Sequence, residues 1–208
     1  MKDPIILSID TSTDQMTAVI SRGNKILVNE SHTERHQVQK LLRLIDTCLE
    51  KCSISLNDID AFATTKGPGS FTGVRTAMGT IKSLAYSTSK PLIAISTLEA
   101  MVHPCDRKTP VVATLPARTD YIYMGVFEFT SDQWHKVTPA CMIPAKELRS
   151  QIPANSLIVG SMANSKFEGI YGTSLSEISL KKYTNKEFED VFTLEPLYIQ
   201  KTAAEGYV

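Results

Sequence analysis

The sequence predicts a mixed α/β fold of two subdomains, the second a degenerate version of the first. Four observations support this. Three short apolar runs separated by turn residues open the chain, an amphipathic helix follows, and strands then alternate with helices. A polar segment with two prolines, residues 103–110, reads as a crossover into a second half. We therefore expect one subdomain over residues 1–102 and another over residues 103–208.

The first half is expected to begin with strands joined by hairpin turns. Turn-forming residues separate the apolar runs, as in consecutive antiparallel strands. The three expected strands cover residues 5–9, 16–20 and 25–28.

A helix is expected from Val38 to Cys52. Its apolar residues at positions 38, 41, 42, 45 and 49 follow the helical repeat and define one core-facing stripe. Leu44, Cys48 and Cys52 lie outside that stripe. The apolar arc is thus wider than a helix on a sheet requires, which favours a second apolar neighbour.

The next segments alternate between strand and helix. Residues 61–65 form a fourth strand, a glycine-rich turn leads into a helix over residues 74–87, and residues 92–95 form a fifth strand. Ser96 and Glu99 have capping-box spacing, so another helix should open there. The order β-β-β-α-β-α-β-α is that of a ribonuclease-H-like subdomain, as repeated in actin-like ATPases.

The second half is less periodic and richer in turn residues. It offers strands at residues 111–115, 121–129 and 157–159 and a helix near residues 145–149. No repeat of fixed period is visible.

Charge and composition argue against several classes of protein. Lysine plus arginine equals aspartate plus glutamate, 22 against 22, so no global positive field favours tight RNA binding by this chain alone. The N-terminus lacks the apolar core of a signal peptide, and no run is long enough for a membrane helix, so we expect a cytoplasmic protein without membrane contact. The four cysteines form no C-x-x-C pair and are expected to be free, buried thiols.

The turn with Gly67, Gly69 and Gly73 stands between a strand and a helix, the usual context of phosphate binding. A Walker loop would need lysine after the last glycine, where Val74 stands. The dinucleotide fingerprint needs G-x-G-x-x-G, whereas this spacing is one residue longer and Pro68 removes a donor. A nucleophile elbow also fails, because Pro68 and Thr72 replace its glycines. The glycines are expected instead to permit tight backbone packing.

The helix after this turn has a surface of small residues. Alanine, glycine, serine and threonine let another helix approach closely. These small residues are Ala77, Gly79, Thr80, Ser83 and Ala85.

Asp10, Thr11, Ser12 and Thr13 follow the first strand and resemble the first phosphate loop of actin-like ATPases, where an aspartate holds hydrated magnesium. An Asx or Ser/Thr turn closing the hairpin is the alternative. The matching second half of a nucleotide site is missing, because residues 111–123 contain no Asp-x-Gly and the chain has no Gly-Gly pair. We expect a vestigial loop and no catalytic residues.

His32 and His36 have the spacing of zinc-binding histidines on a helix. The glutamate that follows the first histidine in zinc proteases is absent, and helical periodicity begins only near Val38. We expect no metal site.

Several segments together resemble the TsaB (YeaZ) family of bacterial tRNA threonylcarbamoyladenosine synthesis. The resemblance is specific to about residue 102, and the Gly67 to Arg75 string is its most diagnostic part. The segments that carry it are residues 6–13, 66–75, 91–100 and 196–199.

The resemblance implies an actin-like fold and a non-catalytic role beside the transferase TsaD, which moves a threonylcarbamoyl group to the adenosine next to the anticodon. It also implies TsaE, an ATPase, in the same assembly, no cofactor of the chain itself with ATP or ADP only at the interface of the complex, and tRNA contact only through the complex. The surplus apolar helix surface favours a homodimer when the chain is alone. The first-subdomain helices would form a bundle with the partner. The expected interface comprises Val38, Leu41, Leu42, Leu44, Ile45, Cys48, Gly69, Phe71, Thr72, Gly73, Val74, Arg75, Ala77, Met78 and Ile81.

Two other functions stay open at this point. One is an ATP-dependent phosphotransferase using Asp10 for magnesium and Thr11 and Thr13 for phosphate. The other is a metallopeptidase-like glycoprotease that would use His32 and His36. A charge at Ala77 is expected to separate the scaffold hypothesis from both, because it should abolish partner binding without unfolding the chain.

Overall fold

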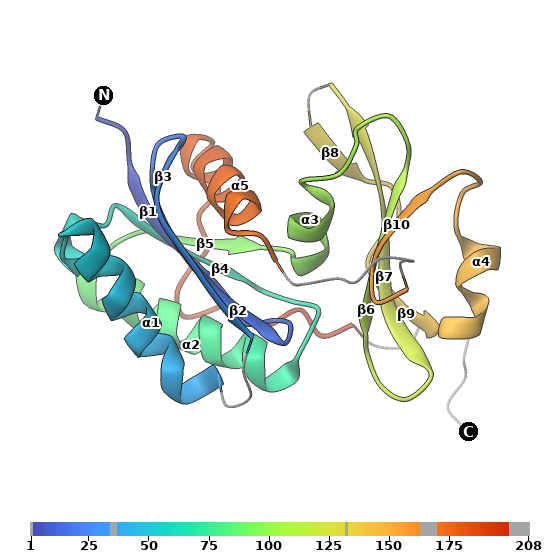
Figure 1. Cartoon of the computed structure of the whole chain (residues 1–208), viewed down its shortest axis with the longest axis horizontal. Helices are drawn as coiled ribbons and strands as arrows, with labels where there is room; N and C mark the ends of the chain where they lie inside the picture. The colour runs from blue at the N-terminus through green and yellow to red at the C-terminus, as the bar shows by residue number, and fades with distance from the viewer. Residues whose placement is uncertain (1, 34–36, 132, 163–169, 200–208) are drawn as a thin grey trace.

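The structure, a computed structural model, describes residues 2–33, 37–131, 133–162 and 170–199. It contains two five-stranded sheets with helices on and between them (Figure 1). The mixed α/β class with two subdomains is confirmed.

The first sheet has the strand order β3-β2-β1-β4-β5, with β1, β2 and β3 antiparallel and β4 and β5 parallel to β1. β1 and β4 are buried along their whole length, which explains their continuous apolar runs. The three N-terminal strands and the two later ones are confirmed. Their bounds are Ile5–Asp10 (β1), Gln15–Arg22 (β2), Lys25–Thr33 (β3), Ala61–Thr65 (β4) and Leu92–Ile95 (β5).

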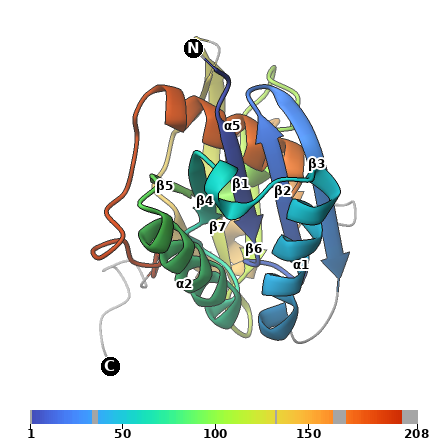
Figure 2. The same ribbon diagram turned by 90° about the vertical axis from the view of Figure 1, so that its left-hand side faces the viewer.

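Two helices, α1 (Gln37–Cys52) and α2 (Phe71–Thr88), lie side by side on one face of this sheet (Figure 2). A short 3-10 turn, Leu56–Asp58, leads from α1 to β4. α2 begins earlier than the expected residue 74, because the Ser70 hydroxyl accepts a hydrogen bond from Gly73 N at 3.2 Å and caps the helix. Within the described residues, no helix has both the length and the apolar character needed to span a bilayer.

The second sheet has the order β10-β6-β7-β8, with β9 also paired to β7. The three strands expected here are confirmed, whereas the short strands β8 and β9 were not predicted. A 3-10 turn, Ala145–Glu147, and α4 (Leu148–Gln151) occupy the region of the expected helix. The strands are Val111–Pro116 (β6), Tyr121–Thr130 (β7), Gln133–Lys136 (β8), Cys141–Pro144 (β9) and Leu157–Gly160 (β10).

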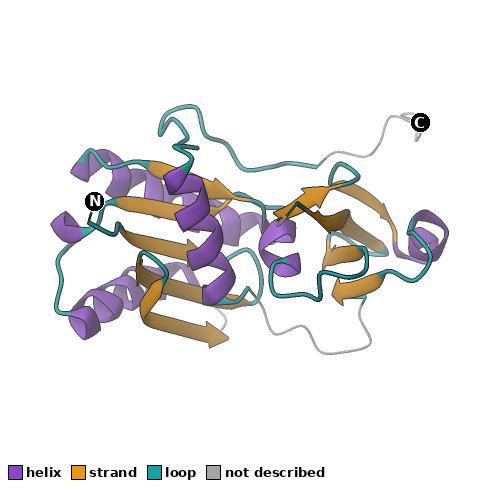
Figure 3. Cartoon of the chain, turned by 90° about the horizontal axis from the view of Figure 1, so that it is seen from above, coloured by secondary structure: helices purple, strands orange, loops and turns teal. Residues whose placement is uncertain are grey.

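Two helices lie between the sheets and connect the halves of the sequence (Figures 1 and 3). α3 (Thr97–Val102) comes from the first half but packs on β6, β7 and β10 of the second sheet. α5 (Gly172–Thr184) comes from the second half but packs on the strands of the first sheet. Both helices share one apolar cluster with both sheets. The packing of α3 and α5 therefore crosses the boundary expected at residue 102. The division into subdomains 1–102 and 103–208 stays a prediction.

Helix α5 was missed by sequence patterning because part of its buried face is polar. Ser174, Ser176 and Ser179 are buried beside Leu175 and Ile178. The Ser179 hydroxyl donates to the Ser176 carbonyl at 3.0 Å, and the Ser8 hydroxyl of β1 donates to Ser179 at 3.1 Å. The small serine side chains let the helix pack close to the sheet. Because they are polar, they interrupt the apolar stripe by which an amphipathic helix is recognised in a sequence.

The expected capping box at α3 is only half right. Ser96 is the N-cap residue, and Glu99 lies in the first turn. The Ser96 side chain makes no cap hydrogen bond, so the reciprocal pair predicted from the spacing is wrong. The entry to this helix is fixed instead by the backbone, since Thr97 N donates to the Gly67 carbonyl at 3.0 Å.

The chain after α5 returns along the edge of the first sheet. Glu189 N donates to the Leu92 carbonyl of β5 at 2.8 Å, and Leu197 N donates to the Lys66 carbonyl at 2.7 Å. The side chain of Lys82 on α2 reaches the Leu194 carbonyl at 2.9 Å. This C-terminal strap, residues 186–199, covers the edge strand β5, which would otherwise offer unpaired backbone groups.

The shared cluster predicts that the two halves unfold together. Leu98 of α3 and Leu175 of α5 are both fully buried in it. Leu98→Ala and Leu175→Ala should each lower the free energy of unfolding by about 2–4 kcal/mol, because each leaves a cavity in the common core. Chemical denaturation followed by circular dichroism should show one cooperative transition for both variants.

Leu157→Ala on β10 is the matched control, because this leucine is exposed and its truncation should have a much smaller effect. Two separate transitions in either core variant would contradict the shared core.

Candidate functional site

The loop after β1 is organised around the carboxyl group of Asp10. Its Oδ1 accepts hydrogen bonds from the Ser12 hydroxyl at 2.5 Å, from Ser12 N at 3.1 Å and from the Thr65 hydroxyl of β4 at 2.5 Å. This is an Asx turn linked to the neighbouring parallel strand. Asp10 therefore ties the carboxyl ends of β1 and β4 together.

Asp10 is fully buried, and its Oδ2 has no hydrogen-bond partner among the described residues. Burial raises the pKa of this carboxyl above its ordinary value of 3.8, although the bonds from Ser12 and Thr65 act in the opposite direction. A carboxyl in this position favours its neutral form more than an exposed aspartate does.

The glycine-rich turn packs directly on this loop through backbone atoms. Ser70 N donates to the Ser12 carbonyl at 2.7 Å, and the Thr11 hydroxyl donates to the Gly73 carbonyl at 2.6 Å. A Cβ atom on Gly69 would overlap the Ser12 carbonyl, and one on Gly73 would overlap the Thr11 carbonyl. The glycines are thus required by close approach of two backbone segments.

This packing contradicts an open phosphate loop at residues 10–13. Asp10, Thr11 and Ser12 are buried, and both hydroxyl groups and Asp10 Oδ1 bond to protein atoms, which leaves only Asp10 Oδ2 of these groups without a partner among the described residues. Thr13 is half-buried, and its hydroxyl bonds within its own turn, to Gln15. The alternative Asx/Ser/Thr turn describes the loop correctly. The residues present do not fit a magnesium–phosphate group in this conformation.

Nine of the residues expected at the interface belong to the core of the chain. On each helix they form the face toward the sheet, so they are not available to a partner. Ala77 is 0 % exposed, and a glutamate there would bury a charge in the core, so the expected test at this position is wrong. The buried residues are Leu41, Leu44, Ile45 and Cys48 on α1 and Gly73, Val74, Ala77, Met78 and Ile81 on α2.

Four expected interface residues do lie on the surface. Leu42 is 58 % exposed on α1, and Phe71 is 60 % exposed at the start of α2. Thr72 and Arg75 are exposed beside Phe71. Gly69 is half-buried in the turn. Val38 lies in α1, but its side chain is outside the described residues.

Arg75 joins α2 to the C-terminal strap. Its guanidinium lies 3.8 Å from the centroid of the Phe71 ring, and its Nε donates to the Tyr198 hydroxyl at 2.7 Å. The rings of Phe71 and Tyr198 are 6.0 Å apart. Tyr198 was missed as a site residue because 123 positions separate it from Arg75 and no local pattern links the two.

The outward face of α2 is made of small side chains. Gly79 is exposed, and a Cβ atom added to it would meet nothing within 4 Å. Thr76 and Ser83 lie one turn to either side of Gly79. Their hydroxyls donate hydrogen bonds to helix carbonyls at 2.8 Å, so these side chains project little from the helix surface. With Leu42 on the adjacent α1, this surface is shaped for close approach by another helix. We call it the α1–α2 face, comprising Leu42, Arg43, Asp46, Thr72, Arg75, Thr76, Gly79, Thr80 and Ser83.

The expectation that the chain holds no zinc stays a prediction. His32 is exposed at the end of β3, and His36 lies outside the described residues. No group of three possible metal ligands occurs within the described ranges.

Gly73→Ala should strongly destabilise the chain, because its methyl group would collide with the Thr11 carbonyl and separate α2 from the loop. We expect a loss of about 2 kcal/mol or more in urea denaturation. Gly79→Ala, in the same helix, is the matched control and should raise stability by about 0.5–1 kcal/mol, because alanine favours a helix where space is open. Equal effects of the two variants would refute the close-approach argument.

Asp10 should give stability a distinct pH dependence. A raised pKa means that the folded chain holds this proton more tightly, so the associated stability is complete below about pH 3.8 and is lost as the pH rises through the raised pKa. Asp10→Asn cannot titrate and should lose less stability than the parent chain over this interval.

Urea denaturation at several pH values from acid to neutral measures the difference. Asp14→Asn, at an exposed position in the same loop, is the control. Parallel pH profiles for Asp10→Asn and the parent chain would show that Asp10 is not responsible.

Known proteins with similar sequences fall into two related groups. The family model of TsaD, tRNA N6-adenosine threonylcarbamoyltransferase, matches residues 25–204. The TsaB protein of Haemophilus influenzae is 29 % identical, with 96 % of this chain and 95 % of that protein covered. The TsaB protein of Escherichia coli is 32 % identical, with 75 % of this chain and 71 % of that protein covered. A Staphylococcus haemolyticus threonylcarbamoyltransferase is 32 % identical over 59 % of this chain but only 43 % of its own length.

Solved structures support the same fold. YeaZ from Pseudomonas aeruginosa superposes with a TM-score of 0.80 at 20 % identity, covering 94 % of this chain and 100 % of that one. Another P. aeruginosa structure, described as similar to peptidase YeaZ, gives a TM-score of 0.82 at 22 % identity, covering 95 % and 100 %. With the sequence match across most of the chain, these findings show that this chain belongs to the TsaB (YeaZ) family.

Proposed function

We propose that this chain is a non-catalytic subunit that supports tRNA threonylcarbamoyladenosine synthesis by binding a TsaD-type transferase through the α1–α2 face. The observation that carries the proposal is the outward surface of α2, which is small, open at Gly79 and adjacent to the exposed Leu42. The names of its TsaB relatives supply the pathway.

A scaffold agrees with the closed loop after β1. Helix α2 is attached to this loop by the bonds from Ser70 and Thr11, and the C-terminal strap holds its other flank through Lys82. A surface held at both sides loses little conformational freedom when a partner docks, which favours affinity.

The phosphotransferase alternative has less support. It needs Asp10 open to magnesium and the Thr11 hydroxyl open to phosphate, whereas Asp10 is fully buried and Thr11 bonds to Gly73. We propose that the chain has no cofactor of its own, with ATP or ADP only at the interface of the complex, and that TsaE joins the larger assembly. We further propose that tRNA is contacted only through the complex, and that the assembly works in the cytoplasm.

Gly79→Gln should separate partner binding from folding. A long side chain at this open position should keep the helix intact, since glutamine is a better helix former than glycine, but it would prevent close approach by a partner helix. Calorimetry with the TsaD protein of the same organism should show binding weakened at least about tenfold, or roughly 1.4 kcal/mol.

Thr173→Gln is the control, because Thr173 is exposed on α5, a helix on the opposite face of the first sheet. Absence of a complex between the parent chain and TsaD at micromolar concentration would overturn the scaffold proposal. If Gly79→Gln binds TsaD as tightly as the parent chain does, TsaD stays the partner, but the α1–α2 face is not the binding surface.

The same face is proposed to form a homodimer when the chain is alone. Leu42 on this face and Phe71 beside it are large apolar side chains left exposed, and a self-complementary patch is the usual basis of a two-fold dimer. Transferase and second copy would then compete for one surface. Sedimentation of Gly79→Gln as a monomer, with the parent chain as a dimer, would support this competition; a dimeric variant would refute it.

A further inference from the structure

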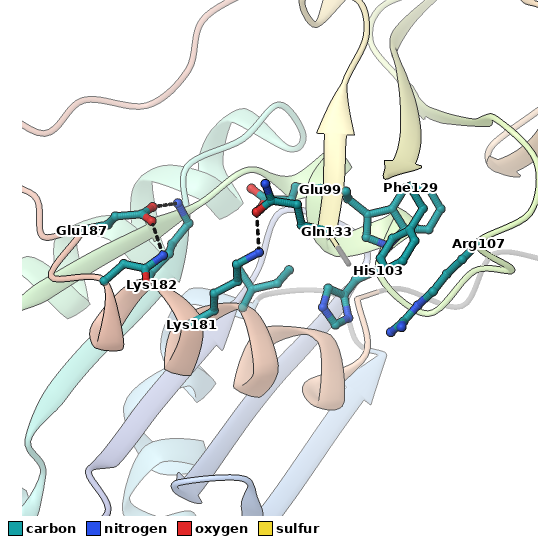
Figure 4. A pocket seen from close by; sticks show the side chains of 11 residues that line it. Glu99, His103, Arg107, Phe129, Gln133, Lys181, Lys182 and Glu187 are labelled. Carbon is teal, nitrogen blue, oxygen red and sulfur yellow. Dashed lines mark hydrogen bonds and ion pairs between the residues drawn. The ribbon is translucent and has the colours of Figure 1, made fainter. Parts of the chain in front are cut away.

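A cavity of about 240 Å³ lies where the elements of the two halves cross (Figure 4). One wall is α3 with the turn that follows it, a second is α5 and its C-terminal turn, and the third is β7 with β8. It is remote in the sequence from the loop after β1, and the proposed function does not use it. The lining residues are Glu99, His103, Arg107, Phe129, Gln133, Trp134, Ile178, Lys181, Lys182, Asn185 and Glu187.

Two cations of this cavity are held in place by uncharged groups. The Arg107 guanidinium lies 4.4 Å from the centroid of the Phe129 ring, and Lys181 Nζ donates to Gln133 Oε1 at 2.9 Å. Neither cation makes an ion pair with a carboxylate within the described ranges. Their positions are therefore fixed without a direct ion pair, although the charge of Glu187 acts on Lys181 at longer range. Cations held in this way can bind an incoming anion directly.

The carboxylates of the lining differ from one another. Glu187 is already paired, with Lys182 at 3.1 Å and the Asn185 amide at 2.9 Å. Glu99 has no ion pair among the residues that the structure covers, and it lies one helical turn before His103. The cavity thus offers one uncompensated carboxylate together with the two cations.

His103 is surrounded by these charges. Burial lowers the pKa of His103, and the charges of Arg107 and Lys181 lower it further, whereas Glu177 and Glu99 raise it. Glu177 Oε2 lies 3.5 Å from His103 Nδ1. At neutral pH the imidazole is mainly uncharged, so it does not compensate Glu99.

The remaining wall is apolar. The rings of Phe129 and Trp134 meet edge to face with centroids 5.4 Å apart, and Ile178 of α5 is buried beside them. An apolar wall beside separated opposite charges is typical of sites for small dipolar molecules, because the charges fix the orientation and the rings bury the remainder.

We propose that this cavity binds a small zwitterion of the amino-acid class with an apolar side chain. Its carboxylate would meet Arg107 and Lys181, its ammonium would meet Glu99, and its side chain would pack on Phe129 and Trp134. A simple polyanion fits less well, because Glu99 would repel it.

The chain contains a built-in reporter for this site. Trp134 is its only tryptophan, so a change in tryptophan fluorescence reports on this wall of the cavity. L-phenylalanine is the probe, because it is an apolar zwitterion and does not absorb at the red edge of tryptophan excitation. We expect a saturable fluorescence change at millimolar concentration or below.

Analogues of the probe separate the charge contacts. N-acetyl-L-phenylalanine lacks the ammonium group, and L-phenylalaninamide lacks the carboxylate, so each should bind at least about tenfold more weakly. The proposal would be overturned if either analogue bound as tightly as L-phenylalanine. It would also be overturned if millimolar phenylalanine gave no fluorescence response, whether or not inorganic phosphate gave one.

Arg107→Gln should weaken binding of the probe at least about tenfold without unfolding the chain, because Arg107 is exposed. Lys108→Gln, the adjacent exposed cation that does not line the cavity, is the matched control. Glu99→Gln should weaken the binding of phenylalanine but should not change the binding of N-acetyl-phenylalanine. Unchanged affinity of both pocket variants, confirmed as folded by circular dichroism, would contradict the assigned contacts.

Discussion

The contact between two backbone segments, the loop after β1 and the turn before α2, determines much of the rest of this structure. Gly69 and Gly73 bring the turn so close to the carbonyls of Ser12 and Thr11 that no side chain fits between them. This contact sets the start of α2, buries Asp10 and closes the place where an open phosphate loop would bind its ligand. One steric requirement therefore closes the loop after β1 and fixes the start of α2.

The sequence predicted the first subdomain well because its signals are local. The alternation of apolar runs and turns located β1 to β5, and the failed comparison of Gly67, Gly69 and Gly73 with phosphate-binding spacings correctly indicated a packing role. Which faces of α1 and α2 are exposed was harder to predict. The wide apolar arc suggested a partner, but Leu44 and Cys48 are covered by the chain itself, because α1 packs on β2, β3 and α2 together.

The remaining features depend on contacts that sequence patterning cannot connect. Helix α5 has serines on its buried face, so its periodicity is weak, and it crosses to the sheet of the other half. Tyr198 reaches Arg75 through the strap, and the cavity combines residues of α3, β8 and α5. No residue of this set stands out from the sequence of its own segment. The side chains come together only because the two halves of the chain cross.

The crossing also separates the two surfaces to which we have assigned proposed binding. α1 and α2 cover one face of the first sheet, whereas α5 covers the other and forms a wall of the cavity (Figure 1). A ligand in the cavity would bridge α3 and α5, which belong to one apolar cluster, and would stabilise the relation between the two sheets. The α1–α2 face rests on a different cluster, with the first sheet between them. A small molecule could thus bind without displacing the proposed partner, and any coupling would have to pass through the first sheet or through the strap that connects α5 with α2.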